Sequence, residues 1–272
     1  MKSFYEWSPL TYWLSVRKCR LVRRCQDMVS GLSFAGMYQN DVLPVIWYTH
    51  KSLIRRTLGD VDPQLQENKA VNLALAAPKI DKIVIEPGEV FSFWHLVGDC
   101  TPKKGYQEGM VISNGQPKAG VGGGMCQMTN LIHWMVLHCP LIILEHHHHD
   151  SMDLFPDFGR QIPFGTGTSI AYNYLDYRFS NPLDFSVQLI LYTDGTYLCG
   201  QLRAEKPLTV RYHIRAENEY FYRHNNQVYR HNEIIRSTVD AASGRLLKRE
   251  LLKENNAKVM YNPQGLDIRE AE

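Results

Sequence analysis

The sequence lacks any uninterrupted run of about 18 apolar residues, so no membrane-spanning helix is expected. It also lacks the pattern of a secretory signal at its N-terminus. There, Glu6, Ser8 and Pro9 interrupt the apolar residues, and the basic residues follow the apolar ones instead of preceding them. We therefore expect a cytoplasmic protein, with an envelope-facing protein as the alternative.

An excess of charge of one sign is also missing. The 30 lysines and arginines nearly balance the 28 acidic residues, which gives a formal net charge of +2. So small a net charge creates no overall electrostatic field that would attract nucleic acid, and no nucleic-acid partner is expected. The 272 residues, 44% of them apolar, are sufficient for a globular protein with a sizeable core.

Paired cysteine motifs are absent as well. The sequence contains no Cys-x-x-Cys pair, and without a signal peptide reduced thiols are expected. Cys19 and Cys25 are six residues apart on a predicted helix, which is poor spacing for zinc. Most of the cysteines are interpreted as small core side chains. The six are Cys19, Cys25, Cys100, Cys126, Cys139 and Cys199.

An amphipathic helix is predicted over residues 10–30. Its apolar stripe consists of Leu10, Leu14, Leu21, Cys25 and Met28. Basic side chains on other faces are Arg17, Lys18, Arg20, Arg23 and Arg24. The stripe favours a surface helix that docks on the core through its apolar side. The alternative is weak contact with an anionic membrane surface.

The periodicity predicts an α+β fold in three segments. Residues 1–66 form an N-terminal helical segment that ends in a polar connection after residue 48. Residues 67–205 form a core domain, in which a central helix follows a glycine-rich loop and packs on a mostly antiparallel sheet. Residues 206–272 form a β-rich extension packed on that core. Predicted elements of the core are a helix at 68–77, strands at 83–85 and 90–93, a hairpin turning at Asn114-Gly115, a helix at 126–138 and a buried strand at 141–146.

The segment "GVGGGMCQMTN", residues 120–130, places Cys126 in the first turn of the central helix. Free amides and the helix dipole there favour negative charge, so we expect a lowered thiol pKa. The glycines allow close backbone approach, and the amides of residues 124–127 are predicted to stabilise an oxyanion. The alternative is a buried thiol beneath a tight glycine turn.

A phosphate cradle is another use of such a loop. Gly-Lys-Ser/Thr is absent, and the glycines are not a Gly-x-Gly-x-x-Gly motif opening a βαβ unit. We therefore expect no nucleotide and no other cofactor.

Four consecutive histidines, His146 to His149, follow the strand after this helix. In an extended chain His146 and His148 share one face, and His147 and His149 share the other. One histidine is a candidate base for Cys126. An alternating pair with Glu145 or Asp150 is a weaker candidate for zinc. The remaining alternative is a solvated strand end.

The loop "DLFPDFGRQIPFGTG" contains Arg160, whose guanidinium is able to bind a substrate carboxylate in a bidentate manner. The alternative for Arg160 is an ordinary surface arginine.

Four segments carry a resemblance to a known family. "PGEVFSFWHLVG", "GVGGGMCQMTNLIHWMVLH", "LEHHHHDSMDLFPDFGRQIPFGTGTSIAYNYLDYRFSN" and "HNEIIRSTVDAASGRLLKRELLKENNAKVMY" resemble the VanW family from about residue 68 to 262. Its Gly-Gly-Gly-x-Cys-Gln core corresponds to Gly122, Gly123, Gly124, Cys126 and Gln127, and its histidine-containing strand end to residues 146–149. The resemblance implies a role in glycopeptide resistance and cell-wall metabolism, and leaves the reaction open.

Our first hypothesis is cysteine-dependent acyl transfer or amide hydrolysis on a peptidoglycan peptide or precursor. Cys126 would be the nucleophile and His147 or His149 the general base. Gly122, Gly123, Gly124, Gln127 and Arg160 would bind the substrate. The second hypothesis is a non-catalytic accessory protein that binds an anionic cell-wall group with the same loop and helix terminus.

Overall fold

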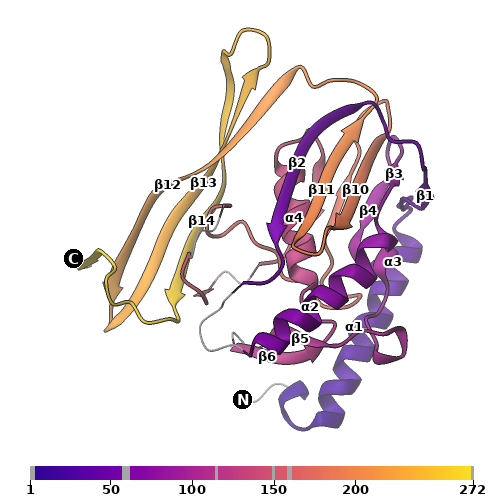
Figure 1. Ribbon diagram of the computed structural model, residues 1–272. Coiled ribbons are helices and arrows are strands. Elements are labelled where there is room, and N and C mark those ends of the chain that lie inside the picture. The colour runs from indigo at the N-terminus through magenta and orange to yellow at the C-terminus, as the bar shows by residue number, and fades with distance from the viewer. Residues whose placement is uncertain (1–3, 57–61, 114–115, 149–150, 158–160, 271–272) are drawn as a thin grey trace.

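The computed structural model describes residues 4–56, 62–113, 116–148, 151–157 and 161–270, which form the predicted α+β fold with a β-rich C-terminal part. Figure 1 shows a body of helices and sheets and, beside it, three long strands, β12 (Val210–His224), β13 (Gln227–Asp240) and β14 (Leu246–Val259). We call these three strands the strand arm. Short 3-10 helices are η1 (Phe4–Glu6), η2 (Ala77–Lys79) and η3 (Pro102–Lys104).

The central sheet of the body is antiparallel, with the order β1-β3-β10-β11-β2. Its strands are β1 (Met37–Tyr38), β2 (Val45–Leu53), β3 (Ile83–Ile85), β10 (Val187–Thr193) and β11 (Tyr197–Ala204). The prediction of a polar connection after residue 48 was wrong up to Leu53. Those residues alternate between the sheet's two faces, and their backbone pairs with β11, so polar side chains are tolerated on this edge strand.

Helix α4 (Met125–Leu137) packs on β2 and β11, as the prediction of a central helix on an antiparallel sheet required. Gly200 in β11 permits this contact. A Cβ at that position would lie 2.5 Å from Leu131 Cδ2 and 2.7 Å from Met135 Cε. The helix can therefore approach the sheet closely, and its apolar side chains join the main core.

A second, three-stranded sheet has the order β4-β9-β7. Its strands are β4 (Val90–Ser92), β9 (Arg178–Ser180) and β7 (Ile142–Glu145). The prediction that the last of these is buried was wrong, because β7 is an edge strand whose Ile142 and Leu144 are 51% and 48% exposed. Its position matters because β7 leads directly into the histidines.

Helix α2 (Pro63–Ala76) begins earlier than the predicted 68–77, because Asp62 caps it and Pro63 occupies its first turn. The Asp62 carboxylate accepts a hydrogen bond from the Gln64 amide at 2.8 Å. Further along, α3 (Phe93–Val97) precedes the predicted hairpin, whose strands are β5 (Glu108–Ser113) and β6 (Gln116–Val121). Its turn residues, 114–115, lie outside the described part.

The strand arm is antiparallel, and β15 (Ile268–Glu270) and β8 (Met152–Asp153) extend it at opposite edges. Asn225 and Asn226 connect β12 to β13 with φ angles of 48° and 58°, which suit a tight two-residue hairpin. The Arg230 guanidinium bonds to Asp153 Oδ2 at 3.3 Å and Glu219 Oε1 at 2.8 Å. This buried ion cluster fixes the 151–157 segment to the arm.

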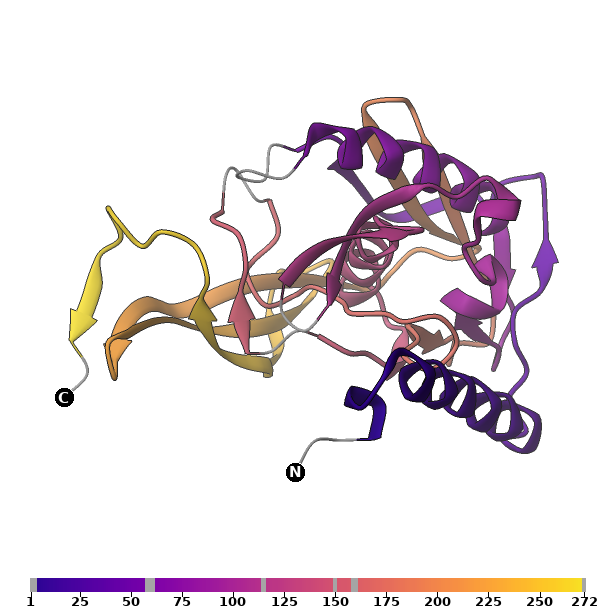
Figure 2. The ribbon, with the colours of Figure 1, turned by 90° about the horizontal axis from the view of Figure 1, so that it is seen from below.

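Helix α1 (Pro9–Val29) confirms the predicted N-terminal helix, and Ser8 and Thr11 form a capping box at its start. The prediction that its apolar stripe docks on the core was wrong. Leu10, Leu21 and Met28 are 64%, 63% and 76% exposed. Figure 2 shows α1 along the outer edge of the molecule.

Charged side chains hold α1 against the body instead. Arg23 donates to both Glu145 carboxylate oxygens at 2.6 Å, and Asp27 accepts from Arg178 at 2.6 and 2.9 Å. Arg20 adds a contact over the Tyr172 ring, 4.7 Å from its centroid. Among the described residues, no helix combines the length and apolarity needed to cross a bilayer.

The interpretation of most cysteines as core side chains also needs correction. Cys139 is fully buried, Cys19 and Cys25 are exposed on α1, and the remaining three are half-buried. None of the six cysteines forms a disulfide bond.

Candidate functional site

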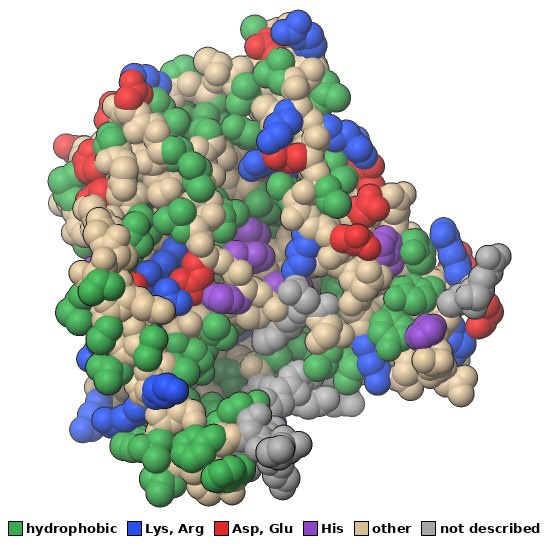
Figure 3. Space-filling model, turned by 180° about the vertical axis from the view of Figure 1, so that it is seen from behind, with side chains coloured by type: hydrophobic (Ala, Val, Ile, Leu, Met, Phe, Trp, Pro, Cys, Tyr) green, Lys and Arg blue, Asp and Glu red, His purple; other side chains and the backbone are tan. Residues whose placement is uncertain are grey.

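A cavity of about 1250 Å³ separates the body from the segments that pack on the strand arm. Its wall combines the glycine loop, the start of α4, the end of β2, part of α2 and the loops around residues 152–157 and 161–172. Figure 3 shows this face of the molecule, which is hollowed between the body and the arm. The cavity is therefore large enough for a peptide-sized ligand.

The three glycines of the loop line this cavity, and each also permits a close packing contact. A Cβ on Gly122 would lie 2.5 Å from Cys100 Cβ, and one on Gly123 would lie 2.2 Å from the Gly109 carbonyl carbon. At Gly124, with φ of 109°, a Cβ would lie 2.3 Å from Lys69 Cγ. Backbone packing alone thus explains why glycine occupies these three positions.

Cys126 lies in the first turn of α4 and lines the cavity. The expectation of a lowered thiol pKa was wrong, because burial raises the pKa of Cys126. Backbone N–H groups of Ile170 and of Cys126 itself act in the opposite direction on that pKa. The resting group is therefore a thiol at neutral pH, and it needs a base to become a nucleophile.

Of the amides of residues 124–127 that were predicted to form an oxyanion site, that of Gln127 is already used. The Gln127 amide donates to the Gly124 carbonyl at 2.9 Å, so it does not face a ligand as predicted. The amides of Gly122 and Gly123 donate to Gln107 and Gly120 at 2.9 and 3.1 Å. Any oxyanion site in this loop must therefore use the amides of residues 124–126.

The Gln127 side chain lines the cavity and also fixes the helix to β2. Its Nε2 donates to Ser52 Oγ at 2.9 Å and to the Leu53 carbonyl at 2.8 Å. One turn further, Asn130 Oδ1 accepts from the amide and hydroxyl of Thr168 at 2.6 and 2.8 Å. These bonds tie α4 both to the end of β2 and to the loop at residues 161–172.

The side chain of His147 points away from those of His146 and His148, as alternation along an extended chain predicts. His148 lines the cavity that contains Cys126, and its ring lies close to Gly167. His146 Nε2 donates to the Gly167 carbonyl at 2.8 Å, and its ring stacks on buried His133 at 4.2 Å. Of His146, His147 and His148, only His148 lines the cavity, and His50 of β2 lines it as well. The prediction favoured His147 and His149.

His147 makes a different contact. Its Nε2 lies 2.9 Å from Glu145 Oε1, the same carboxylate that pairs with Arg23. His147 is not among the cavity-lining residues of the described chain, because Glu145 draws its ring toward α1. His149 and Arg160 lie outside the described residues, so their predicted roles remain predictions.

The cavity also contains a buried lysine, Lys69, which the sequence analysis did not identify. Lys69 is 6% exposed, and its Nζ donates to Gln66 Oε1 at 2.7 Å. Burial, aided by the positive charges of Arg56 and Arg55, lowers its pKa to about 8. All three basic residues line the cavity, but the Arg55 guanidinium is already paired with Glu67 at 2.7 and 2.8 Å. The attraction of this wall for an anionic group therefore depends mainly on Lys69 and Arg56.

Metal coordination by the histidine cluster finds no support among the described residues. Within them, no three histidine, cysteine or acidic side chains form a group that could hold an ion. The prediction was an alternating pair of the four histidines with Glu145 or Asp150, and His149 and Asp150 lie outside that part of the chain.

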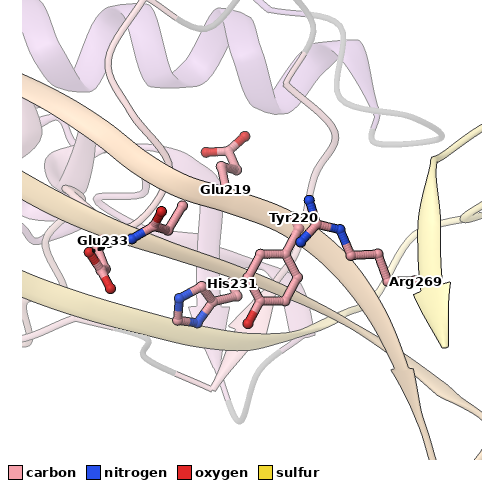
Figure 4. A pocket seen from close by; sticks show the side chains of 6 residues that line it. Glu219, Tyr220, His231, Glu233 and Arg269 are labelled. Carbon is pink, nitrogen blue, oxygen red and sulfur yellow. Dashed lines mark hydrogen bonds between the residues drawn. The ribbon is translucent and has the colours of Figure 1, made fainter. Parts of the chain in front are cut away.

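A smaller hollow of about 320 Å³ lies on the strand arm (Figure 4). There the Tyr220 ring lies between His231, stacked at 4.7 Å, and the Arg269 guanidinium, 4.7 Å from the ring centroid. Asn218 donates to Glu233 at 2.9 Å across the same hollow. These side chains bond mainly to one another, which is typical of surface packing on a sheet.

Fold and cavity together define an α+β protein with a half-buried cysteine at the N-terminus of its central helix. The model of the family described as VanW like protein matches residues 68–203. The chain is 32% identical over 89% of its length to the vancomycin B-type resistance protein VanW of Enterococcus faecalis, and covers 88% of that protein. This chain belongs to the VanW family.

A second relative is an uncharacterized protein of Bacillus subtilis, YoaR. Identity is 31% over 42% of this chain and 36% of that protein. No solved structure matches this chain.

Proposed function

We propose that the protein serves glycopeptide resistance and cell-wall metabolism by cysteine-dependent acyl transfer or amide hydrolysis on a peptidoglycan peptide or precursor. The observation that carries the proposal is that Cys126 and His148 line one peptide-sized cavity. Kinship with a vancomycin B-type resistance protein supports the cell-wall context.

In the proposed reaction, Sγ of Cys126 attacks the carbonyl carbon of a substrate amide while His148 takes the thiol proton. The C–N bond then breaks, and His148 returns that proton to the departing amine. Water or a second amine next attacks the thioester carbonyl, which releases the acyl group and restores the thiol. Water gives hydrolysis, and an amine gives transfer.

The raised pKa of Cys126 determines how the base must act. A thiolate formed in advance would need no partner, but a buried thiol loses its proton only as the new bond forms. His148 takes this role in place of the predicted His147, because His147 is held by Glu145. The backbone amides near the sulfur would then stabilise charge on the tetrahedral intermediate.

The basic wall suggests how the substrate is oriented. Lys69, Arg55 and Arg56 line the cavity within the same region as the glycine loop. Peptidoglycan peptides end in a carboxylate, which a guanidinium or ammonium group binds well. We expect the terminal carboxylate on this wall and the amide to be cleaved near Cys126.

Two observations favour non-catalytic binding as the second candidate function. Burial keeps the Cys126 thiol protonated, and close packing explains all three glycines without chemistry. In this case the same basic wall would bind an anionic cell-wall group that leaves unchanged.

The test is incubation of purified protein with muropeptides, followed by mass spectrometry of products and of the intact protein. Catalysis predicts shorter or transferred peptides and a thioester adduct on Cys126. Cys126→Ser and His148→Ala should each lower turnover by about a hundredfold or more. The matched control is Cys199→Ser, which alters another half-buried thiol outside the cavity lining.

The same variants separate the two functions in cells. If Cys126→Ser restores glycopeptide resistance as well as the wild type does in a deletion strain, catalysis by this cysteine is excluded. If Lys69→Met then abolishes both resistance and calorimetric binding of muropeptides, the binding function is supported.

A further inference from the structure

The outward face of α1 is apolar although its inward face is charged. Arg20, Arg23 and Asp27 contact the body, and they lie on one side of the helix at spacings of three and four residues. The apolar stripe lies roughly opposite, since each residue turns the helix by about 100°. In a surface helix docked on a core the arrangement is normally the reverse.

The apolar surface continues over the helix and the residues before it. Several of these side chains are aromatic, including Trp7 and Trp13, which are 66% and 48% exposed. The exposed large apolar residues of this region are Phe4, Tyr5, Trp7, Leu10, Tyr12, Trp13, Leu14, Leu21, Val22, Met28 and Val29. Apolar side chains exposed along one face of a helix mark a site of contact with another phase or molecule. Tyr12 is not part of that face, because a rotation of about 100° per residue places it on the inward side.

Basic side chains flank the apolar stripe on both sides. Arg17 and Arg24 follow one edge and Lys18 the other, and all three are exposed. The Arg17 guanidinium lies 4.3 Å from the Trp13 ring centroid. Leucine on the apolar face, Trp13 toward its rim, and lysine or arginine beside them suit the interface between acyl chains and headgroups.

We propose that α1 seats the protein on an anionic phospholipid surface. The flanking basic residues decide between a membrane and a second copy of this chain. Two copies packing through the same face would bring like charges together, whereas anionic headgroups complement these charges. The body contacts of Arg23 and Asp27 keep the helix in place, so the lipid-facing side is preformed.

Seating on lipid would also place the cavity beside the membrane. Arg20 lies on α1 between the body and the outward face, and it lines the cavity that contains Cys126. A ligand carried by a lipid would therefore reach the cavity from the surface on which α1 rests. The lipid contact does not depend on whether Cys126 is catalytic.

The test is co-sedimentation of the purified full-length protein with vesicles. One set contains phosphatidylglycerol in phosphatidylcholine, and the other contains phosphatidylcholine alone. We expect binding to the anionic vesicles, weakened by salt. The double variant Leu14→Glu, Leu21→Glu should lower the partition coefficient by about tenfold per leucine, and removal of each basic flank residue by about fivefold.

The matched control is Leu247→Glu, Leu251→Glu on β14. These leucines are 47% and 55% exposed, against 43% and 63% for Leu14 and Leu21. The control should bind vesicles as the wild type does. Equal loss in both double variants, or no binding by the wild type, would overturn the proposal. So would a concentration-dependent dimer in light scattering that only the α1 variant abolishes.

Discussion

The alkyl chain of Lys69 packs directly on Gly124. A Cβ on this glycine would lie 2.3 Å from Lys69 Cγ. The contact joins α2 to the residue that precedes α4, two positions before Cys126. It places a buried ammonium group and a half-buried thiol on one cavity wall.

Gly124→Ala should destabilise the protein by about 3 kcal/mol, because the φ angle of 109° is strained for alanine and the new methyl overlaps Lys69. Urea unfolding followed by tryptophan fluorescence measures the change. Gly88→Ala is the control, since φ there is 80° and nothing lies within 4 Å of the added Cβ. It should cost only about 1 kcal/mol. Equal losses would show that the Lys69 contact does not matter.

Lys69→Met should stabilise the protein by about 2 kcal/mol at pH 7, because methionine fills a similar volume without a buried charge. The advantage should shrink as the pH rises. The folded protein releases the Lys69 proton above a pKa of about 8, whereas the unfolded chain keeps it to a pKa near 10.5. Within that window the unfolded state holds more protons, so wild-type stability rises relative to the variant.

Urea unfolding of both proteins at pH 7 and pH 9.5 measures this change. The comparison must be made as a difference, because buried tyrosines and Cys139 have raised pKa values that act in the opposite direction. Lys118→Met, which replaces an exposed lysine, is the matched control for the change of residue type. A constant difference for Lys69→Met would contradict a lowered pKa.

Cys126 should react slowly with iodoacetamide at pH 7, and its rate should still be rising above pH 9, because burial raises its pKa. Peptide mass spectrometry after timed quenching gives the rate for each cysteine. Exposed Cys19 in the same sample serves as the internal reference. A Cys126 rate that is already maximal below pH 7 would mean that the thiolate is stabilised. That result would support the lowered thiol pKa that the helix N-terminus predicts and would contradict the raised one.

The Arg23–Glu145 pair should couple by about 1–3 kcal/mol in a double-mutant cycle of Arg23→Gln and Glu145→Gln. Both side chains are largely buried, and Arg23 bonds to both carboxylate oxygens. Thermal unfolding of the four proteins gives the coupling. Arg24→Gln, an exposed neighbour on the same helix, should be nearly neutral. Additive losses would show that α1 is held by its other contacts.

The sequence predicted the elements of this fold better than their surroundings. Periodicity located α1 and α4 because their apolar residues recur at helical spacing, and it identified the antiparallel tail from alternation. It could not tell which way α1 faces, since a hydrophobic stripe shows which side chains share a side and not what covers them. Three charged residues, far apart in sequence from their partners, decided that orientation.

Part of the candidate site could likewise be predicted from the sequence, and part of it could not. The glycine loop and Cys126 were visible because glycines followed by a cysteine at a helix start form a local pattern. The choice among the histidines depended on Glu145 turning His147 aside, and Lys69 looked like an ordinary solvated lysine on α2. Burial also reversed the expected direction of the Cys126 pKa, because desolvation exceeded the effect of the helix terminus.

The pairing of β2 with β11 has a consequence for how the chain is made. Val45 lies opposite Ala204, more than half the chain later, so β2 has no strand to pair with in the central sheet until β11 leaves the ribosome. Until then, an emerging chain presents the unpaired backbone of β2 to its surroundings. Polar Thr49, His50, Lys51 and Ser52 on that strand are what protects the unfinished protein from pairing with its neighbours.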